Sequence, residues 1–302
     1  MLGSLEGKTA VITGGTRGFG YAMAQAFIQE GANVVVASRS QESVESAVTA
    51  LKAFGRAAGR VCNVSDREQV QDLANLATLE FGGFEIWVNN AGIAAPYGPT
   101  IQVEPEAFVE VIQTNILGTY YGSVVAMRHF LSKPVDGNRG KLINILGRGD
   151  RQQVPNQNAY AASKAWVRSF TLALAKEYKD SGIGIFAFNP GMMETALLED
   201  VEVVAGYEDR LKIMPTIIRM WASPPEVPAE RAVWLASEAT DGKTGLEVHQ
   251  SNPLQFLVGV LREAWLRITG QGEPTRPVQV RPVPPAFETN AGKKLEPSYQ
   301  TE

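Results

Sequence analysis

Cysteine is almost absent from this chain of 302 residues, where Cys62 is the only one. One thiol cannot form an intramolecular disulfide or build a cysteine-rich metal site. A reducing compartment suits such a chain, and we expect a cytoplasmic protein. Histidine is nearly as scarce, with His129 and His249 the two present. Neither has another histidine, a cysteine or paired acids at ligand spacing, so we predict no metal site.

Long apolar runs and long basic runs are also missing. No window approaches the roughly 18 uncharged apolar residues of a membrane span, and the start of the chain has no secretory-signal pattern. The formal net charge is −4. With no Lys/Arg run either, nothing indicates binding to nucleic acid or to an anionic membrane. A small-molecule substrate is the expected partner.

Short β-branched runs alternate with segments of helical periodicity along most of the chain. This alternation predicts a doubly wound, Rossmann-type α/β fold, in which helices cover both faces of a mostly parallel sheet. Ligands of such sheets bind beyond the carboxyl ends of the strands. The expected strands are Thr9–Ile12, Asn33–Ala37, Phe84–Val88, Lys141–Leu146 and Gly184–Phe188.

A glycine-rich turn follows the first expected strand and leads into a helical stretch from Tyr21 to Gln29. It reads Thr13-Gly14-Gly15-Thr16-Arg17-Gly18-Phe19-Gly20. Glycines permit a tight turn and close backbone approach, and the exposed amides at the helix start attract a pyrophosphate. A glycine cluster alone can be a purely structural loop. The order of strand, turn and helix favours a dinucleotide site.

The end of the second expected strand lacks the acid that usually holds the adenosine ribose hydroxyls. The sequence there is Ala37-Ser38-Arg39-Ser40. Arg39, with Arg17 from the glycine turn, could grip a ribose 2′-phosphate through charge-assisted hydrogen bonds. The missing acid and the two arginines predict NADP(H) rather than NAD(H) as the cofactor. The alternative is that Arg39 is a solvated turn residue.

Further segments occur in the order in which the short-chain dehydrogenase/reductase family carries them, over roughly residues 5–248. The turn has the family's spacing Thr13-x-x-x-Gly18-x-Gly20. Asn89-Asn90-Ala91-Gly92 resembles the family's segment beside the adenosine. Cys62-Asn63-Val64 stands where the family usually has Asp-Val against the adenine, with Asn63 replacing the acid. Pro190-Gly191-Met192-Met193-Glu194-Thr195 resembles the loop that contacts the nicotinamide.

This resemblance implies a cofactor site gathered from several loops and, because family members are commonly dimers or tetramers, a homodimer or homotetramer. The implied cofactor-binding residues are Gly14, Thr16, Arg17, Gly18, Phe19, Gly20, Ser38, Arg39, Asn63, Val64, Asn90, Ala91, Gly92, Tyr160, Lys164, Pro190, Gly191 and Thr195.

Tyr160-x-x-x-Lys164 matches the family's catalytic pair, and Asn115 matches the asparagine of its proton relay. Four positions apart on a helix expected to begin near Asn156, the two side chains project from one face. A free phenol has a pKa of about 10, so a neighbouring ammonium is needed to favour phenolate. By resemblance, Lys164 also binds the nicotinamide ribose while Tyr160 protonates the carbonyl oxygen.

The pattern breaks at Gly147, where the family has a serine that orients the substrate oxygen; no Ser or Thr occurs from Lys133 through Ala162. Losing such a donor commonly costs around 10²- to 10³-fold in rate. The loop Arg148-Gly149-Asp150-Arg151-Gln152-Gln153, or the following Asn156 and Asn158, could supply another donor. Alternatively, the substrate could bring its own hydroxyl or need room at Gly147. As a third alternative, the protein could catalyse no ordinary carbonyl reduction.

Residues 1–250 are expected to form the dinucleotide-binding domain, with residues 196–228 as a lid. Residues 251–302 would add a helix, capped by Asn252, and a tail. Six of the 17 prolines lie between Gln271 and Glu302. They predict an extended tail that is either disordered or lies on a neighbouring subunit.

The function predicted from these features is reduction of a ketone or aldehyde, or oxidation of the alcohol, by hydride transfer. The substrate is expected to be small and hydrophobic, with Gly147, Arg148 and Met192 as candidate contacts. A different class stays open. In that class the chain binds cofactor but acts as a non-redox isomerase or cyclase, or has a regulatory or assembly role.

Overall fold

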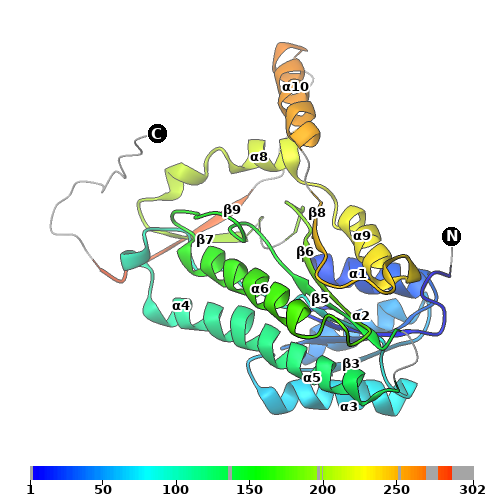
Figure 1. Cartoon of the computed structure of the whole chain (residues 1–302). Coiled ribbons are helices and arrows are strands. Elements are labelled where there is room, and N and C mark those ends of the chain that lie inside the picture. The colour runs from blue at the N-terminus through cyan, green and yellow to red at the C-terminus, as the bar shows by residue number, and fades with distance from the viewer. Residues whose placement is uncertain are drawn as a thin grey trace.

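The computed structural model describes residues 3–134, 138–195, 198, 200–250, 253–269 and 278–287. A seven-stranded parallel sheet lies at its centre, in the order β3-β2-β1-β4-β5-β6-β8 (Figure 1). This confirms the predicted doubly wound fold. Sequence patterns missed β3, because its Ala-Ala-Gly start has no β-branched side chain. The strands are β1 Thr9–Thr13, β2 Asn33–Ser38, β3 Ala57–Val61, β4 Ile86–Asn89, β5 Gly140–Ile145, β6 Ile183–Asn189 and β8 Glu247–His249.

The order of strands reverses between β1 and β4. The chain runs outward from β1 to β3 and then returns to place β4 on the other side of β1, with Ala10 opposite Ile86. Connections on the two sides of this point leave in opposite directions and open a crevice at the carboxyl edge of the sheet. The glycine turn after β1 and the Asn90–Gly92 segment after β4 both lie there.

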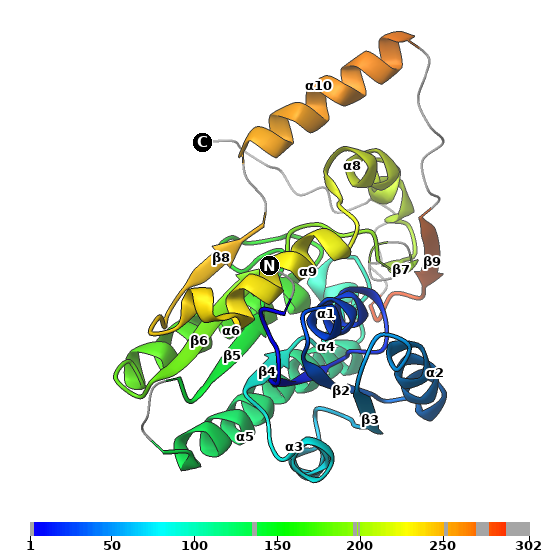
Figure 2. The same cartoon turned by 90° about the vertical axis from the view of Figure 1, so that its right-hand side faces the viewer.

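Helices cover both faces of the sheet, as Figure 2 shows. On one face Phe27 and Leu235 join the core formed with Phe188, and on the other Trp87 packs with Phe130. Both faces are buried, so the strands are nearly continuous apolar runs. The first face holds α1 Gly18–Gln29, α2 Gln41–Leu51 and α9 Glu226–Ala236, and the second holds α3 Arg67–Phe81, α5 Gly118–Ser132 and α6 Asn158–Glu177.

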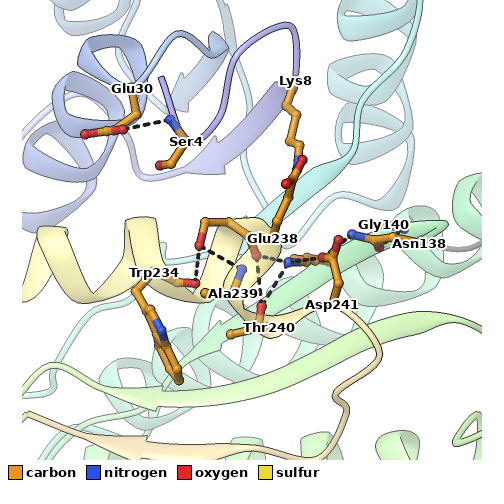
Figure 3. A network of polar contacts seen from close by, with 12 residues as sticks. Ser4, Lys8, Glu30, Asn138, Gly140, Trp234, Glu238, Ala239, Thr240 and Asp241 are labelled. Carbon is orange, nitrogen blue, oxygen red and sulfur yellow. Dashed lines mark hydrogen bonds and ion pairs between the residues drawn. The ribbon is translucent and has the colours of Figure 1, made fainter. Parts of the chain in front are cut away.

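A polar network closes the opposite, amino-terminal end of β5. The buried ammonium of Lys141 lies 2.7 Å from the Asp241 carboxylate and 2.9 Å from the Thr240 hydroxyl, and it also donates to the Ser237 carbonyl. Figure 3 shows Asp241 beside Asn138, whose amide donates to it at 2.7 Å. Burial lowers the pKa of Lys141. This network fastens the end of the sheet that is remote from the glycine turn.

The region beyond β6 holds a second, smaller sheet. Strand β7 (Asp200–Val204) lies in the segment predicted as a lid, and β9 (Gln279–Val283) lies in the proline-rich tail. The two strands pair in parallel, so the described part of the tail lies on its own chain. The short helix η3 (Glu208–Leu211) and α8 (Met214–Trp221) follow β7.

Helix α10 (Pro253–Thr269) projects from the body of the molecule and packs against α8 (Figures 1 and 2). The nearly buried Glu263 carboxylate pairs with the Arg219 guanidinium at 2.6 Å. The predicted cap, Asn252, lies outside the described residues. Among the helices of the described ranges, none is long and apolar enough to cross a membrane.

Candidate active site

The glycine turn after β1 is held against the segment after β4. The Asn90 side chain donates hydrogen bonds of 3.0 Å to the carbonyls of Thr13 and Gly14, and the Thr13 hydroxyl accepts from the amides of Asn90 and Ala91. Gly14 has a φ of 63°, and a Cβ there would lie 2.9 Å from Ala91 Cα. Only glycine permits both this backbone and this approach.

Helix α1 begins in the turn with its first amides free of any side-chain cap. Arg17 occupies the cap position in an extended conformation, and its side chain makes no cap hydrogen bond to the first turn. Uncapped amides and the helix dipole together favour an anion. Thr195 lies over this turn, since its Cγ2 is 3.5 Å from the position of a Cβ at Gly18. These residues fit the pyrophosphate of a dinucleotide.

The end of β2 presents hydroxyls and an arginine instead of a carboxylate. Ser38 Oγ accepts from the Ser40 amide at 3.3 Å, and Ser40 Oγ caps α2 by accepting from the Ser43 amide. Arg39 and Arg17 are both exposed, and neither forms an ion pair or hydrogen bond with a described side chain. Two exposed cationic side chains therefore lie in the turns that follow β1 and β2.

The end of β3 carries a turn that leads into α3. Asn63 Oδ1 accepts from the amide of Ser65 at 3.2 Å and from its hydroxyl at 2.9 Å, while Val64 is buried close to Gly118. The side chain of Asn63 thus shapes its own turn. Burial raises the pKa of the Cys62 thiol to about 11, so this cysteine is unreactive at neutral pH.

Asn115 lies in a π-helical turn, η2 (Ile112–Leu117), between α4 (Pro105–Val111) and α5. Such bulges often occur at functional sites because they turn a side chain out of the helical register. The buried Asn115 side chain exchanges two 2.9 Å hydrogen bonds with the backbone of Ile93 and donates another to Ser163 Oγ. It therefore links the segment after β4 to helix α6.

Tyr160 and Lys164 lie one turn apart on α6, with the Lys164 Nζ 5.6 Å from the centre of the Tyr160 ring. Lys164 donates to the carbonyl of Ile145 at 2.9 Å, and its Nζ lies 3.6 Å from the position of a Cβ at Gly92. Desolvation by burial raises the pKa of Tyr160 to about 12 and lowers that of Lys164 to about 8. The phenol is consequently protonated at neutral pH, and the phenolate that the neighbouring Lys164 ammonium was expected to favour is disfavoured here.

Gly147 follows β5 and lies directly beside Tyr160 and Lys164. A Cβ at this position would overlap the Tyr160 hydroxyl and would lie 3.2 Å from Tyr160 Cζ and 3.5 Å from Lys164 Cε. The space of the family's serine side chain is therefore filled by the phenol. Asp150, three residues later, is buried, accepts from Asn189 Nδ2 at 3.0 Å, and its negative charge contributes to the raised pKa of Tyr160.

A pocket opens on the flank of Tyr160. Its wall combines small and apolar side chains with three carboxamides at the start of α6. Asn156, with a φ of 64°, and Asn158 are held by Tyr97 Oη and Thr100 Oγ1 at 3.3 and 3.2 Å. The lining residues are Ala95, Pro96, Gly98, Thr100, Val103, Phe108, Asn156, Gln157, Asn158, Ala159 and Tyr160.

A cluster of two carboxylates and one imidazole lies at Asp150, Glu247 and His249. Their possible metal-ligand atoms all lie within 4.8 Å of one another. Arg168 binds Glu247 through two hydrogen bonds of 2.7 and 2.8 Å, and Arg151 adds a third at 2.8 Å. These hydrogen bonds lower the pKa of Glu247 to about 2, and those from Arg168 have the largest effect. The arginines already supply the positive charge that a metal ion would bring.

The structure thus brings the predicted residues of the glycine turn, Asn90, Asn115, Tyr160 and Lys164 to one edge of the sheet. Two candidate substrate contacts are less involved. Arg148 is exposed, and Met192 uses its carbonyl to accept from the Ser223 amide at 3.1 Å. Neither lines the pocket beside Tyr160. Sequence reasoning missed the pocket wall formed by residues 95–108, for which no spacing motif gave a signal, and it named Asp150 only as one residue of the loop 148–153.

Comparison with known proteins places the chain among dehydrogenases and reductases. A family model described as short chain dehydrogenase matches residues 8–203. A 3beta-hydroxysteroid dehydrogenase 1 of Eggerthella lenta is 38% identical over 247 residues, 81% of this chain and 92% of that protein. Glucose 1-dehydrogenase 2 of Bacillus subtilis is 32% identical over 247 residues, covering 81% and 93%.

A solved structure agrees with these relatives. The 3-ketoacyl-(acyl-carrier-protein) reductase from Brucella melitensis, complexed with NADH, superposes with a TM-score of 0.72 at 31% identity, covering 82% of this chain and 97% of that one. The family match runs from before β1 through the whole of α6. This chain therefore belongs to the short-chain dehydrogenase/reductase family of nicotinamide-dependent oxidoreductases.

Proposed function

We propose that this protein is an NADP(H)-dependent reductase of a small hydrophobic ketone or aldehyde, or a dehydrogenase in the reverse direction. The observation that carries the proposal is the position of the Tyr160 phenol. It shares the turn of α6 with Lys164 and forms part of the wall of the apolar pocket.

The cofactor would be held by the glycine turn at its pyrophosphate and by Lys164 at its nicotinamide ribose. When bound, it supplies or accepts the hydride. The Tyr160 hydroxyl donates its proton to the substrate oxygen during reduction, and it takes a proton back during oxidation. Asn115, fixed by Ile93 and Ser163, keeps α6 in register with the segment after β4.

The preference for NADP(H) rests on charge at the end of β2. Arg39 and Arg17 are exposed there, and Ser38-Arg39-Ser40 contains no carboxylate. An acid would bind the ribose hydroxyls of NAD(H), whereas two guanidinium groups suit a 2′-phosphate. The related Brucella reductase is complexed with NADH, so the cofactor preference of this chain rests on these residues alone.

The pocket composition supports a neutral, mostly apolar substrate. Pro96, Val103 and Phe108 supply apolar surface, while no charged side chain lines the pocket among the described residues. We propose that the carboxamides of Asn156, Gln157 and Asn158 provide the hydrogen bond to the substrate oxygen that a serine at position 147 gives in the family. Relatives named as hydroxysteroid and glucose dehydrogenases act on alcohols, which agrees with this reaction class.

The decisive experiment mixes the purified protein with NADPH and a panel of ketones while the absorbance of the reduced nicotinamide is followed. Wild type should turn over at least one apolar ketone. The Tyr160→Phe variant should lose about 10²- to 10⁴-fold in rate while binding NADPH as tightly as wild type. Tight NADPH binding without turnover of any ketone would overturn the proposal and favour a non-redox isomerase or cyclase, or a regulatory role.

We also propose a cytoplasmic homodimer or homotetramer. The apolar side chains that α10 exposes, including Leu257, Leu261 and Trp265, support association because such groups are seldom left in water together. Light scattering during size-exclusion chromatography measures the assembly directly, and a monomer at micromolar concentration would contradict it.

A further inference from the structure

We propose that the C-terminal strand β9 supports the outer wall of the substrate pocket and thereby helps to select the substrate. This inference rests on the proposed function, because it takes the pocket beside Tyr160 as the substrate site. Strand β9 lies about 75 residues beyond the end of the family match at residue 203. A segment outside the shared family region would therefore contribute to specificity.

Strand β9 is paired with β7 along its full length. The register places Asp200 opposite Gln279 and Val204 opposite Val283, and the Ala205 amide continues the ladder by donating to the Val283 carbonyl at 2.9 Å. On the exposed face, the Arg281 guanidinium binds the Asp200 carboxylate at 2.7 and 3.1 Å. Pro282, which has no amide hydrogen, suits a strand at the edge of a sheet.

Strand β7 is in turn attached to the pocket wall. Tyr97 bridges to Val203, with its amide donating to the Glu202 carbonyl at 2.8 Å and its carbonyl accepting from the Val204 amide at 2.9 Å. Gly98 lies so close to Val204 that a Cβ there would be 2.7 Å from the Val204 Cβ. The wall formed by residues 97 and 98 therefore depends on the position of β7.

The same wall reaches the start of the catalytic helix. The Gly98 amide donates to the Asn156 carbonyl at 2.9 Å, and the Asn156 side chain donates to Tyr97 Oη at 3.3 Å. Asn156 has a left-handed backbone, which asparagine adopts more readily than most non-glycine residues. Four residues later comes Tyr160. A continuous set of contacts thus runs from β9 to the residue proposed to transfer the proton.

A small apolar core connects these parts. Val280 of β9 and the pocket residue Val103 both pack against this core, which includes the buried Val203 of β7. Beyond the strand, the Ala286 amide donates to the Gln102 carbonyl at 3.0 Å, next to the pocket residue Thr100. A two-stranded sheet is only marginally stable by itself. Residues 97–103, β7 and β9 should therefore order and open together as one unit.

The test compares two variants of the full chain that each add one charge at neighbouring positions of β9. Val280→Asp places a carboxylate in the small core, whereas Gln279→Lys places an ammonium on the exposed side, opposite Asp200. Amide hydrogen exchange of residues 97–103 and 200–204 should become about 10-fold faster or more in Val280→Asp and stay unchanged in Gln279→Lys. The milder Val280→Ala should move exchange in the same direction.

Kinetics give the second measurement. The KM for the ketone should rise about 10-fold in Val280→Asp, since the pocket wall loses its support, while the Kd for NADPH stays within about 2-fold of wild type. Unchanged exchange in Val280→Asp, or faster exchange with unchanged KM, would overturn the inference. If wild type reduces no ketone, the proposed function fails, while the exchange data still test whether β9 supports this wall.

Discussion

Gly147 and Tyr160 occupy each other's space. The Tyr160 hydroxyl lies where the side chain of any other residue at position 147 would begin, and Lys164 Cε lies 3.5 Å from the same point. The missing serine is therefore more than a lost donor, because the phenol occupies the volume that a serine side chain would fill.

Restoring the serine should consequently not improve the enzyme. Both Gly147→Ser and Gly147→Ala should lower kcat/KM about 10- to 100-fold, because the added Cβ displaces the Tyr160 hydroxyl from its reactive position. Steady-state kinetics with the ketone accepted by wild type measure the change. A gain in activity for Gly147→Ser with a loss for Gly147→Ala would show that the hydroxyl matters more than the overlap.

The affinity for NADPH should depend on the charge of Lys164. Burial lowers the pKa of Lys164 to about 8, so its ammonium is present below that pH and is lost above it. We expect the Kd for NADPH to rise about 10-fold or more between pH 7 and pH 9.5, the cost of one charge-assisted hydrogen bond. Fluorescence titration measures the Kd. In Lys164→Met the Kd should be weaker at all pH values and should not change over this range.

Arg39 should set the choice between the two nicotinamide cofactors. Arg39→Asp removes a cation that would face the 2′-phosphate and supplies an acid for ribose hydroxyls, so the preference for NADPH over NADH should fall about 100-fold. The ratio of the two kcat/KM values measures this preference. Arg56→Asp is the matched control. Arg56 is also exposed, but it comes just before β3, at the amino-terminal edge of the sheet and away from the glycine turn. An equal effect in both variants would contradict the assignment.

Glu247 should stabilise the fold in a pH-dependent way. Its pKa is depressed to about 2, chiefly by Arg168, so its contribution is complete above the unfolded value of 4.5 and is lost as the pH falls towards 2. Glu247→Gln should lower the free energy of unfolding by about 1–3 kcal/mol at pH 7, with the difference from wild type shrinking below pH 4.5. Urea unfolding measures it. The exposed Glu238→Gln should change stability by less than about 0.5 kcal/mol.

The parallel sheet could be predicted because its strands are buried on both faces and therefore consist of β-branched runs that stand out locally. Strand β3 was missed, since Ala57, Ala58 and Gly59 give no such signal. Strands β7 and β9 were missed for a different reason. Each is stabilised mainly by its partner 79 positions away in register, from Asp200 to Gln279, and single-segment patterns do not reveal such pairing.

The sequence alone determined the parts of the site that depend on local spacing. The glycines of the first turn and the four-residue separation of Tyr160 and Lys164 follow from backbone geometry within one segment. Only the tertiary structure decided what surrounds them: the overlap of Gly147 with the phenol, the burial of Asp150, and the pairing of β7 with β9. Those depend on contacts between segments far apart in the chain, whose distances are set by the packing of the whole sheet.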